Sequence, residues 1–180
     1  MFYVFLADGF EETEAIAPID ILRRAGVHVC TVGVGGEMIR SSHNLYVNAD
    51  ITIDQFEIND GIEGVILPGG MPGVKNLYAE ERVLKSVRYC FDNGLYVCAI
   101  CAAPMILGRL GVLIGKKATC FPGFEGDLQG ATVTGKHVTV DGKVITAKGA
   151  GCALEFGFAI VAEVCGKKAA DNVATAMQTK

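Results

Sequence analysis

The chain has 180 residues, of which 51% are hydrophobic, and its formal net charge at pH 7 is −4. A chain of this length can bury a core without disulfides or a structural metal, and we expect one domain spanning residues 1–180. Its 16 basic residues are interspersed with 20 acidic residues. No basic surface strip is therefore predicted, which excludes a nucleic acid as the main partner.

The beginning of the chain, MFYVFLADGFEE, is apolar only over residues 1–7 and has no basic flank. This run is too short for a signal peptide and far too short to cross a bilayer. The seven cysteines are an odd number spread over apolar segments, which disfavours a disulfide framework. We therefore expect a cytoplasmic protein with no membrane partner, in which most cysteines are small buried side chains.

Short apolar runs rich in β-branched and aromatic residues alternate with helical patterns along the chain. Strands are predicted at 2–7, 28–34, 64–67, 95–100, 137–140 and 143–147. Helices are predicted at 11–25, 80–92, 102–110, 152–164 and 167–177. This alternation indicates βαβ units, so we expect an α/β three-layer sandwich of the flavodoxin-like kind with a mostly parallel sheet.

Turn-forming residues support these boundaries. Glycines follow three of the helical runs: Gly26, Gly94 and Gly166. Helices often end at a residue with a left-handed backbone conformation, which glycine adopts most easily. The pair Asp141-Gly142 lies between two strand-like runs and predicts a hairpin. Pro18 falls inside the first helical pattern and is expected to kink it or to begin a new turn.

Four junctions beside these strands are rich in small residues: ADGFEETE, LPGGMPG, AICAAP and AKGAG. A parallel sheet brings such junctions to one edge, which is where ligands bind in open α/β sheets. Small residues also let the backbone approach a ligand closely. We therefore expect the functional site at this edge.

In AICAAP the chain passes from a strand directly into a helix at Cys101, which predicts a nucleophile elbow with cysteine in place of serine. A helix N-terminus favours a thiolate, so a lowered pKa is expected for Cys101. The backbone N–H groups of Gly70 and Ala102 are then candidate oxyanion donors. The spacing alone leaves a buried structural cysteine open as the alternative, although Cys90 and Cys165 fit that role better.

Two other kinds of motif receive less support. Cys98 and Cys101 form a C-x-x-C pattern, which is typical of thioredoxin-like redox pairs. Because Cys98 falls inside a predicted strand, we expect it to be buried in the sheet, which disfavours the redox pair. No P-loop or dinucleotide-binding glycine motif occurs in a strand-to-helix setting, so nucleotide binding is not expected.

The stretch GFEETEAIAP offers three carboxylates in a first helical turn. For Glu11 and Glu12 the simplest interpretation is that they complement the helix dipole. Glu14 lies next to the apolar pair Ala15-Ile16. If it faces inward it is desolvated, its pKa is raised, and it can share a proton with a neighbouring thiolate. The dipole interpretation stays open for Glu14 as well.

Three histidines occur in the chain. His28 and His137 open strand-like runs and are expected at strand ends on the surface, whereas His43 lies in a connection and can approach the site. No histidine pair has metal-ligand spacing and no Cys/His cluster resembles a zinc site. No metal is therefore expected.

Four stretches of the chain match one family: GFEETEAIAPIDILRRAG, VILPGGMPGVKNL, AICAAPMILGRLGVLIGKKAT and GAGCALEFGFAIV. With them the chain resembles the ThiJ/PfpI superfamily, in its DJ-one branch. The stretches cover nearly the whole chain in the family's order and spacing. So broad a match is more specific than any single motif.

The resemblance implies a flavodoxin-like homodimer without a metal or organic cofactor. It also implies that Cys101 is the reactive cysteine, that Glu14 hydrogen-bonds its sulfur, and that the backbone amides of Gly70 and Ala102 line an oxyanion pocket. His43 falls near a position where relatives place a basic residue at the dimer interface, which makes it a candidate accessory residue.

The chain departs from the family pattern at two positions. Phe121 precedes Pro122 where some relatives carry a histidine close to the reactive cysteine. Ala102 follows Cys101 where the protease-like branch has a histidine. A peptidase mechanism therefore lacks its obvious general base.

The resemblance implies an enzyme of the glyoxalase or deglycase type, a hydro-lyase or hydrolase. It would convert a small aldehyde such as methylglyoxal to lactate, or deglycate methylglyoxal adducts of proteins or metabolites. The alternative is an oxidative-stress sensor or chaperone that works through oxidation of Cys101. Amidase or peptidase activity ranks last, because it needs a histidine near Cys101 and only His137 follows it in the sequence.

Overall fold

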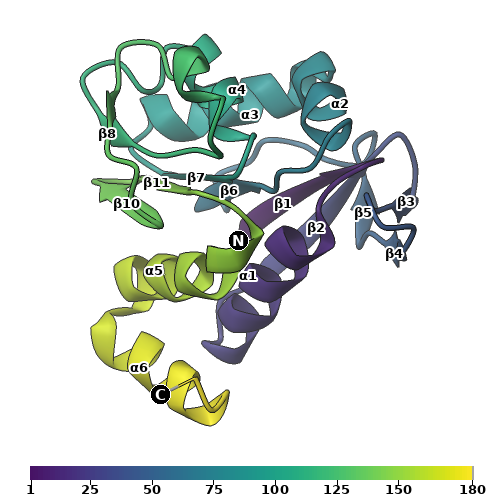
Figure 1. Ribbon diagram of the computed structural model, residues 1–180. Coiled ribbons are helices and arrows are strands. Elements are labelled where there is room, and N and C mark those ends of the chain that lie inside the picture. Colours follow the sequence, from purple (N-terminus) through teal and green to yellow (C-terminus); the bar gives the residue numbers. More distant parts are fainter. Residues whose placement is uncertain (180) are drawn as a thin grey trace.

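The six predicted strands and one further strand pair into one seven-stranded sheet in a computed structural model, which describes residues 1–179 (Figure 1). In spatial order its strands are β10 (Val138–Asp141), β11 (Val144–Ala147), β7 (Tyr96–Ile100), β6 (Gly64–Leu67), β1 (Phe2–Ala7), β2 (Val29–Val34) and β5 (Ile51–Thr52). Neighbouring strands run parallel, except that β10 is antiparallel to β11. The mostly parallel α/β sheet expected from the sequence is therefore confirmed.

Helices cover both faces of this sheet and complete the three layers (Figure 1). One face carries α1 (Glu12–Arg24), α5 (Ala153–Cys165) and α6 (Lys167–Ala176), and the other carries α2 (Gly73–Ala79), α3 (Glu81–Asp92) and α4 (Pro104–Arg109). Side chains of β1 alternate between the two cores: Phe2, Val4 and Leu6 pack with α1 and α5, whereas Tyr3 and Phe5 pack on the opposite face. Burial on both faces explains why β1 is continuously apolar.

Most predicted elements are confirmed within one or two residues, but two helices differ. α4 begins at Pro104 and not at residue 102, because residues 101–103 form a turn. α2 was not predicted, because LPGGMPG has the composition of a loop. Other short elements were also missed, since two or three residues show no periodicity: β5, β3 (Met38–Arg40), β4 (Tyr46–Asn48), β8 (Lys117–Ala118), β9 (Thr132–Val133) and 3₁₀ turns at Glu125–Asp127 and Ala150–Cys152.

The turn residues behave largely as expected. Gly26, Gly94 and Gly166 have φ angles of 80°, 65° and 88° at helix ends. Gly142 has a φ of 61° in the hairpin that joins β10 to β11. Pro18 does not begin a new helix, because α1 continues from Glu12 to Arg24 around it.

All seven cysteines are free thiols. Cys90 and Cys98 are fully buried, and the position of Cys98 inside β7 disfavours a redox pair with Cys101. The expectation of a buried role for Cys165 is wrong, because the last turn of α5 leaves this side chain exposed. Within residues 1–179 no helix has the length and apolar composition needed to cross a bilayer.

Candidate active site

Cys101 occupies the turn between β7 and α4, at the carboxyl edge of the sheet. Its φ angle is 65°, which residues other than glycine rarely adopt. Its backbone is held on both sides, because its N–H donates to the Ala147 carbonyl at 2.9 Å and its carbonyl accepts the Phe121 N–H at 2.8 Å. These bonds hold the strained turn in place, and the partly buried thiol has the backbone geometry of a nucleophile elbow.

Glu14 brings a carboxyl group to this thiol from the first turn of α1. Its side chain is 1% exposed and hydrogen-bonds Cys101. Glu14 Oε2 accepts the Gly69 N–H at 2.9 Å, and the Ala150 N–H is a further donor. Glu11 fixes this turn, since Glu11 Oε2 accepts the Glu14 N–H at 2.7 Å and the Glu11 N–H donates to the Gly69 carbonyl at 2.9 Å.

Two backbone N–H groups, those of Gly70 and Ala102, hydrogen-bond the Cys101 sulfur. Gly70 has a φ of 90°, which favours glycine, and a Cβ there would lie 2.5 Å from the Glu11 nitrogen. Donors aimed at the sulfur are also placed to bind an oxygen on a carbon that bonds to it. The structure thus brings together the four predicted site residues Cys101, Glu14, Gly70 and Ala102.

Burial dominates the acid–base properties of the pair. Burial raises the pKa of Glu14 to about 7, as expected, although hydrogen bonds from Cys101 and Gly69 favour its carboxylate. Burial also raises the pKa of Cys101 to about 12, and the nearby Glu14 charge contributes to this rise. The Ala102 and Gly70 amides lower this pKa, but their effects are smaller. The lowered pKa expected for Cys101 is therefore wrong, because burial of the thiol and the neighbouring Glu14 carboxyl outweigh the two amides.

His43 lies at the rim of the site and does not contact Cys101. Its Nδ1 is 3.0 Å from Glu12 Oε1, and its side chain is 72% exposed. Ser42 Oγ donates to the other oxygen of Glu12 at 3.1 Å. Within residues 1–179 no hydrogen bond joins His43 to Cys101 or Glu14, and its accessory role stays a prediction.

A potential metal-binding group lies at the same rim. Glu11, Glu12 and His43 place ligand atoms within 4.8 Å of one another. Glu11 Oε2 already caps α1, however, and Glu12 pairs with His43. The positive end of a helix dipole also disfavours a cation at this place. The chemistry of these residues therefore does not support a metal centre.

A cavity of about 420 Å³ borders the site. Phe121 and Pro122 form one wall, and the backbone of residues 149–152 forms another. Each wall is joined to a site residue, because the Phe121 N–H donates to the Cys101 backbone carbonyl and the Ala150 N–H donates to the Glu14 carboxylate. His137 also lines the cavity, but its Nδ1 pairs with Glu155 at 3.3 Å. Neither Cys101 nor Glu14 lines this cavity, which has room for a small molecule next to the loops that hold them.

A sequence model of the DJ-1/PfpI family matches residues 2–163. The chain belongs to this family. The match extends from β1 into α5 and so contains Cys101, Glu14 and all the loops around them.

This DJ-1/PfpI protein is similar to named relatives over most of its length. It is 37% identical to the protein dj-1beta of Drosophila melanogaster over 174 residues. This alignment covers 95% of this chain and 92% of the relative. It is 30% identical over 148 residues to a protein of Pyrococcus abyssi named a deglycase, over 81% of this chain and 87% of that one. The structure of oxidized Toxoplasma gondii DJ-1 superposes with a TM-score of 0.94 at 31% identity, over 98% and 97% of the two chains.

Two residues of the site were not predicted from the sequence. Gly69 touches both reacting groups: a Cβ at this position would lie 2.6 Å from Cys101 Cβ and 3.1 Å from Cys101 Sγ. Ala150 supplies an N–H to Glu14 through its backbone alone. The only available signal was the small-residue content of LPGG and AKGAG, which does not say which residue approaches which group.

Proposed function

We propose that this DJ-1/PfpI protein is a cofactor-independent cysteine enzyme that converts small 2-oxoaldehydes such as methylglyoxal to 2-hydroxy acids and deglycates methylglyoxal adducts. The observation that carries the proposal is the buried Glu14 carboxyl, which hydrogen-bonds the Cys101 thiol and has its pKa raised to about 7. An acid of this pKa both accepts and returns protons near neutral pH. The 30% identity to a Pyrococcus abyssi protein named a deglycase supports the same class of activity.

In the first step the Cys101 sulfur bonds to the aldehyde carbon of methylglyoxal. The thiol is protonated at neutral pH, so the Glu14 carboxylate accepts its proton as the bond forms. The aldehyde oxygen becomes negatively charged, and the N–H groups of Gly70 and Ala102 stabilise it. Return of the proton to this oxygen gives a hemithioacetal.

In the second step Glu14 moves a proton between the two carbons. Its carboxylate removes the hydrogen from the carbon bonded to sulfur, and the electron pair passes to the neighbouring carbonyl oxygen, which gives an enediolate. Glu14 then protonates the neighbouring carbon, and the hydroxyl proton on the sulfur-bearing carbon moves to the enediolate oxygen, which leaves a lactate thioester on Cys101. One water molecule hydrolyses this thioester and releases lactate and the free thiol.

Direct measurement of lactate tests the proposal. Purified protein is incubated with methylglyoxal in the absence of glutathione, and Cys101→Ala sets the background. We expect lactate to accumulate over many turnovers with the natural chain and to stay at background with the variant. Product must be counted, because the six other cysteines can trap the aldehyde reversibly and imitate its consumption. Equal lactate from both proteins would contradict the proposal.

A second candidate function, redox sensing through Cys101, is supported by the same groups. The N–H groups of Gly70 and Ala102 can donate to the oxygens of a cysteine sulfinate, and protonated Glu14 can donate a third hydrogen bond. After mild peroxide we expect mass spectrometry to find more dioxidised Cys101 than Cys165, the most exposed of the thiols. Oxidation that follows exposure alone, with Cys165 reacting first, would contradict this function.

We also propose that the protein acts as a homodimer, as the family resemblance implies. Large apolar side chains are exposed on α1 and on the β3–β4 hairpin, namely Ile16, Leu45 and Tyr46. The two elements adjoin each other through the Glu12–His43 pair, so these side chains can form one surface for a second copy. Light scattering should give twice the mass of the chain, and a monomeric mass at micromolar concentration would contradict the dimer.

Amide hydrolysis receives no comparable support, since His43 and His137 pair with glutamates and not with Cys101.

A further inference from the structure

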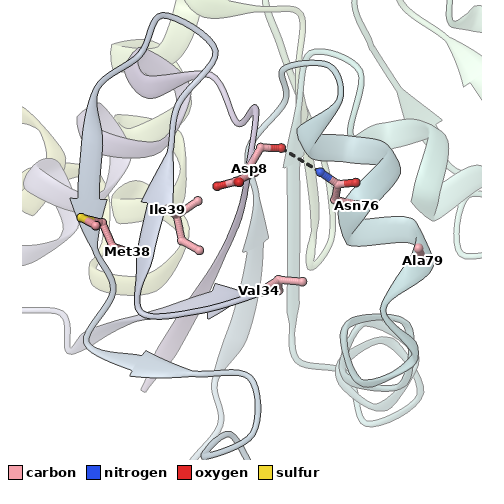
Figure 2. A pocket seen from close by; sticks show the side chains of 7 residues that line it. Asp8, Val34, Met38, Ile39, Asn76 and Ala79 are labelled. Carbon is pink, nitrogen blue, oxygen red and sulfur yellow. Dashed lines mark hydrogen bonds between the residues drawn. The ribbon is translucent and has the colours of Figure 1, made fainter.

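A second cavity, of about 310 Å³, lies at the carboxyl ends of β1 and β2, between the β3–β4 hairpin and α2 (Figure 2). Neither Cys101 nor Glu14 lines it, and the proposed reaction does not use it. Ligands of open α/β sheets bind outside the carboxyl ends of the strands, so its place in the fold suits a binding site.

The polar side chains of this cavity are Asp8 and Asn76, and both are held in position. Asp8 Oδ1 accepts the Arg40 N–H at 2.8 Å. Asn76 Nδ2 donates to the Asp8 carbonyl at 2.9 Å (Figure 2). Within residues 1–179 no lysine or arginine side chain pairs with the Asp8 carboxylate, and neither its second oxygen nor Asn76 Oδ1 accepts a hydrogen bond. Asp8 and Asn76 are both exposed to solvent, and they form two fixed acceptors at the cavity, one of which is charged.

The remaining side chains around these acceptors are apolar. Val34 and Ile39 come from β2 and β3, Met38 precedes Ile39 on the same strand, and Ala79 ends α2 (Figure 2). No basic side chain lines the cavity. An anion would therefore meet the Asp8 carboxylate without a compensating charge, and a sugar would place its many hydroxyl groups against alkyl side chains.

We infer that this cavity binds the ammonium group of a small aliphatic amine, with its alkyl chain against Val34 and Ala79, since the Ile39 side chain is buried in the core. An ammonium group carries three donors and no acceptor, which complements the free oxygen of Asp8 and Asn76 Oδ1. This cavity shares no lining residue with the cavity of Phe121 and Pro122, and neither Cys101 nor Glu14 lines it, so the inference does not rest on the proposed function.

Titration of isotope-labelled protein with n-butylammonium chloride, followed by NMR at constant ionic strength, tests the site. We expect saturable shifts of the Arg40 backbone amide and the Asn76 side-chain amide. n-Butanol has the same alkyl chain without the charge and should bind at least about tenfold more weakly. Asp8→Asn keeps an acceptor for the Arg40 N–H and should weaken amine binding at least as much. Asp60→Asn removes the same charge from a loop outside the cavity and should leave binding unchanged.

A second variant tests the position of the alkyl chain. Ala79→Leu places a larger side chain in the cavity wall and should also weaken binding, without removing a charge. Shifts that do not saturate, equal binding of the amine and the alcohol, or equal loss in Asp60→Asn would each overturn the inference. The chemical-shift dispersion of each free variant shows whether it is folded before the titration begins.

Discussion

Glu14→Gln is expected to lower the rate of lactate formation from methylglyoxal by roughly 10²–10⁴-fold, the range that one positioned acid–base group contributes. Glutamine can still accept the Gly69 N–H and contact the Cys101 sulfur, but it cannot accept the thiol proton or move a proton between the substrate carbons. Steady-state kinetics should show the loss in kcat. Full activity in this variant would rule out the proton-transfer role of Glu14.

Glu12→Gln is the matched control for this experiment. Glu12 lies in the same first turn of α1, but it pairs with His43 at the rim and not with Cys101. This variant loses a negative charge from the same helix end, so it reports the part of any effect that comes from the dipole. We expect its kcat to stay within about threefold of the natural chain.

The same Glu14→Gln variant should become relatively more stable as the pH rises. The folded state raises the pKa of Glu14 from 4.5 to about 7, so it holds more protons than the unfolded state between these values. The stability contributed by Glu14 is complete below pH 4.5 and is lost as the pH rises to 7, by about 3 kcal/mol. Glutamine has no such dependence. Thermal unfolding at pH 4 and pH 8 should show that the stability of Glu14→Gln relative to the natural chain is greater at pH 8. A difference in stability that does not change with pH would contradict the raised pKa.

Gly69→Ala is expected to disrupt the site although it adds a single methyl group. The new Cβ would lie 2.6 Å from Cys101 Cβ and would also clash with Glu14 Oε2, so one of the two reacting groups must move. A displacement of about 1 Å can lower turnover by about 100-fold. Overpacking of a buried position should also lower the free energy of unfolding by about 1–3 kcal/mol.

Gly126→Ala provides the comparison for this second variant. A Cβ at position 126 meets no other atom within 4 Å, and the glycine has no positive φ angle. We would measure lactate formation and urea unfolding for both variants. Gly126→Ala shows the general effect of replacing a glycine by alanine, and any further loss in Gly69→Ala comes from the clash. If Gly69→Ala matches Gly126→Ala in both measurements, Gly69 does not hold the two groups apart.

The sequence alone determined those features that depend on local pattern. A continuous apolar run predicts β1 because a strand covered on both faces has no polar side. The passage from strand to helix in AICAAP predicts the turn at Cys101, although the apolar neighbours of Glu14 only allow its burial and leave the dipole interpretation open. Each of these features follows from a few consecutive residues, because the backbone and its nearest side chains decide them.

Only the tertiary structure decided which groups meet and how they ionise. Gly69 lies 55 positions from Glu14 in the chain, yet its N–H bonds that carboxylate, and nothing in LPGG singles it out from Gly70. The pKa of Cys101 is raised because burial and a neighbouring acid outweigh two amides, a balance that depends on distances through space. Asp8 and Asn76 likewise share a cavity only because the sheet brings the ends of β1 and β2 beside α2. Desolvation and charge interactions depend on distances through space between groups that are far apart in the sequence, and the spacing of residues along the chain does not give those distances.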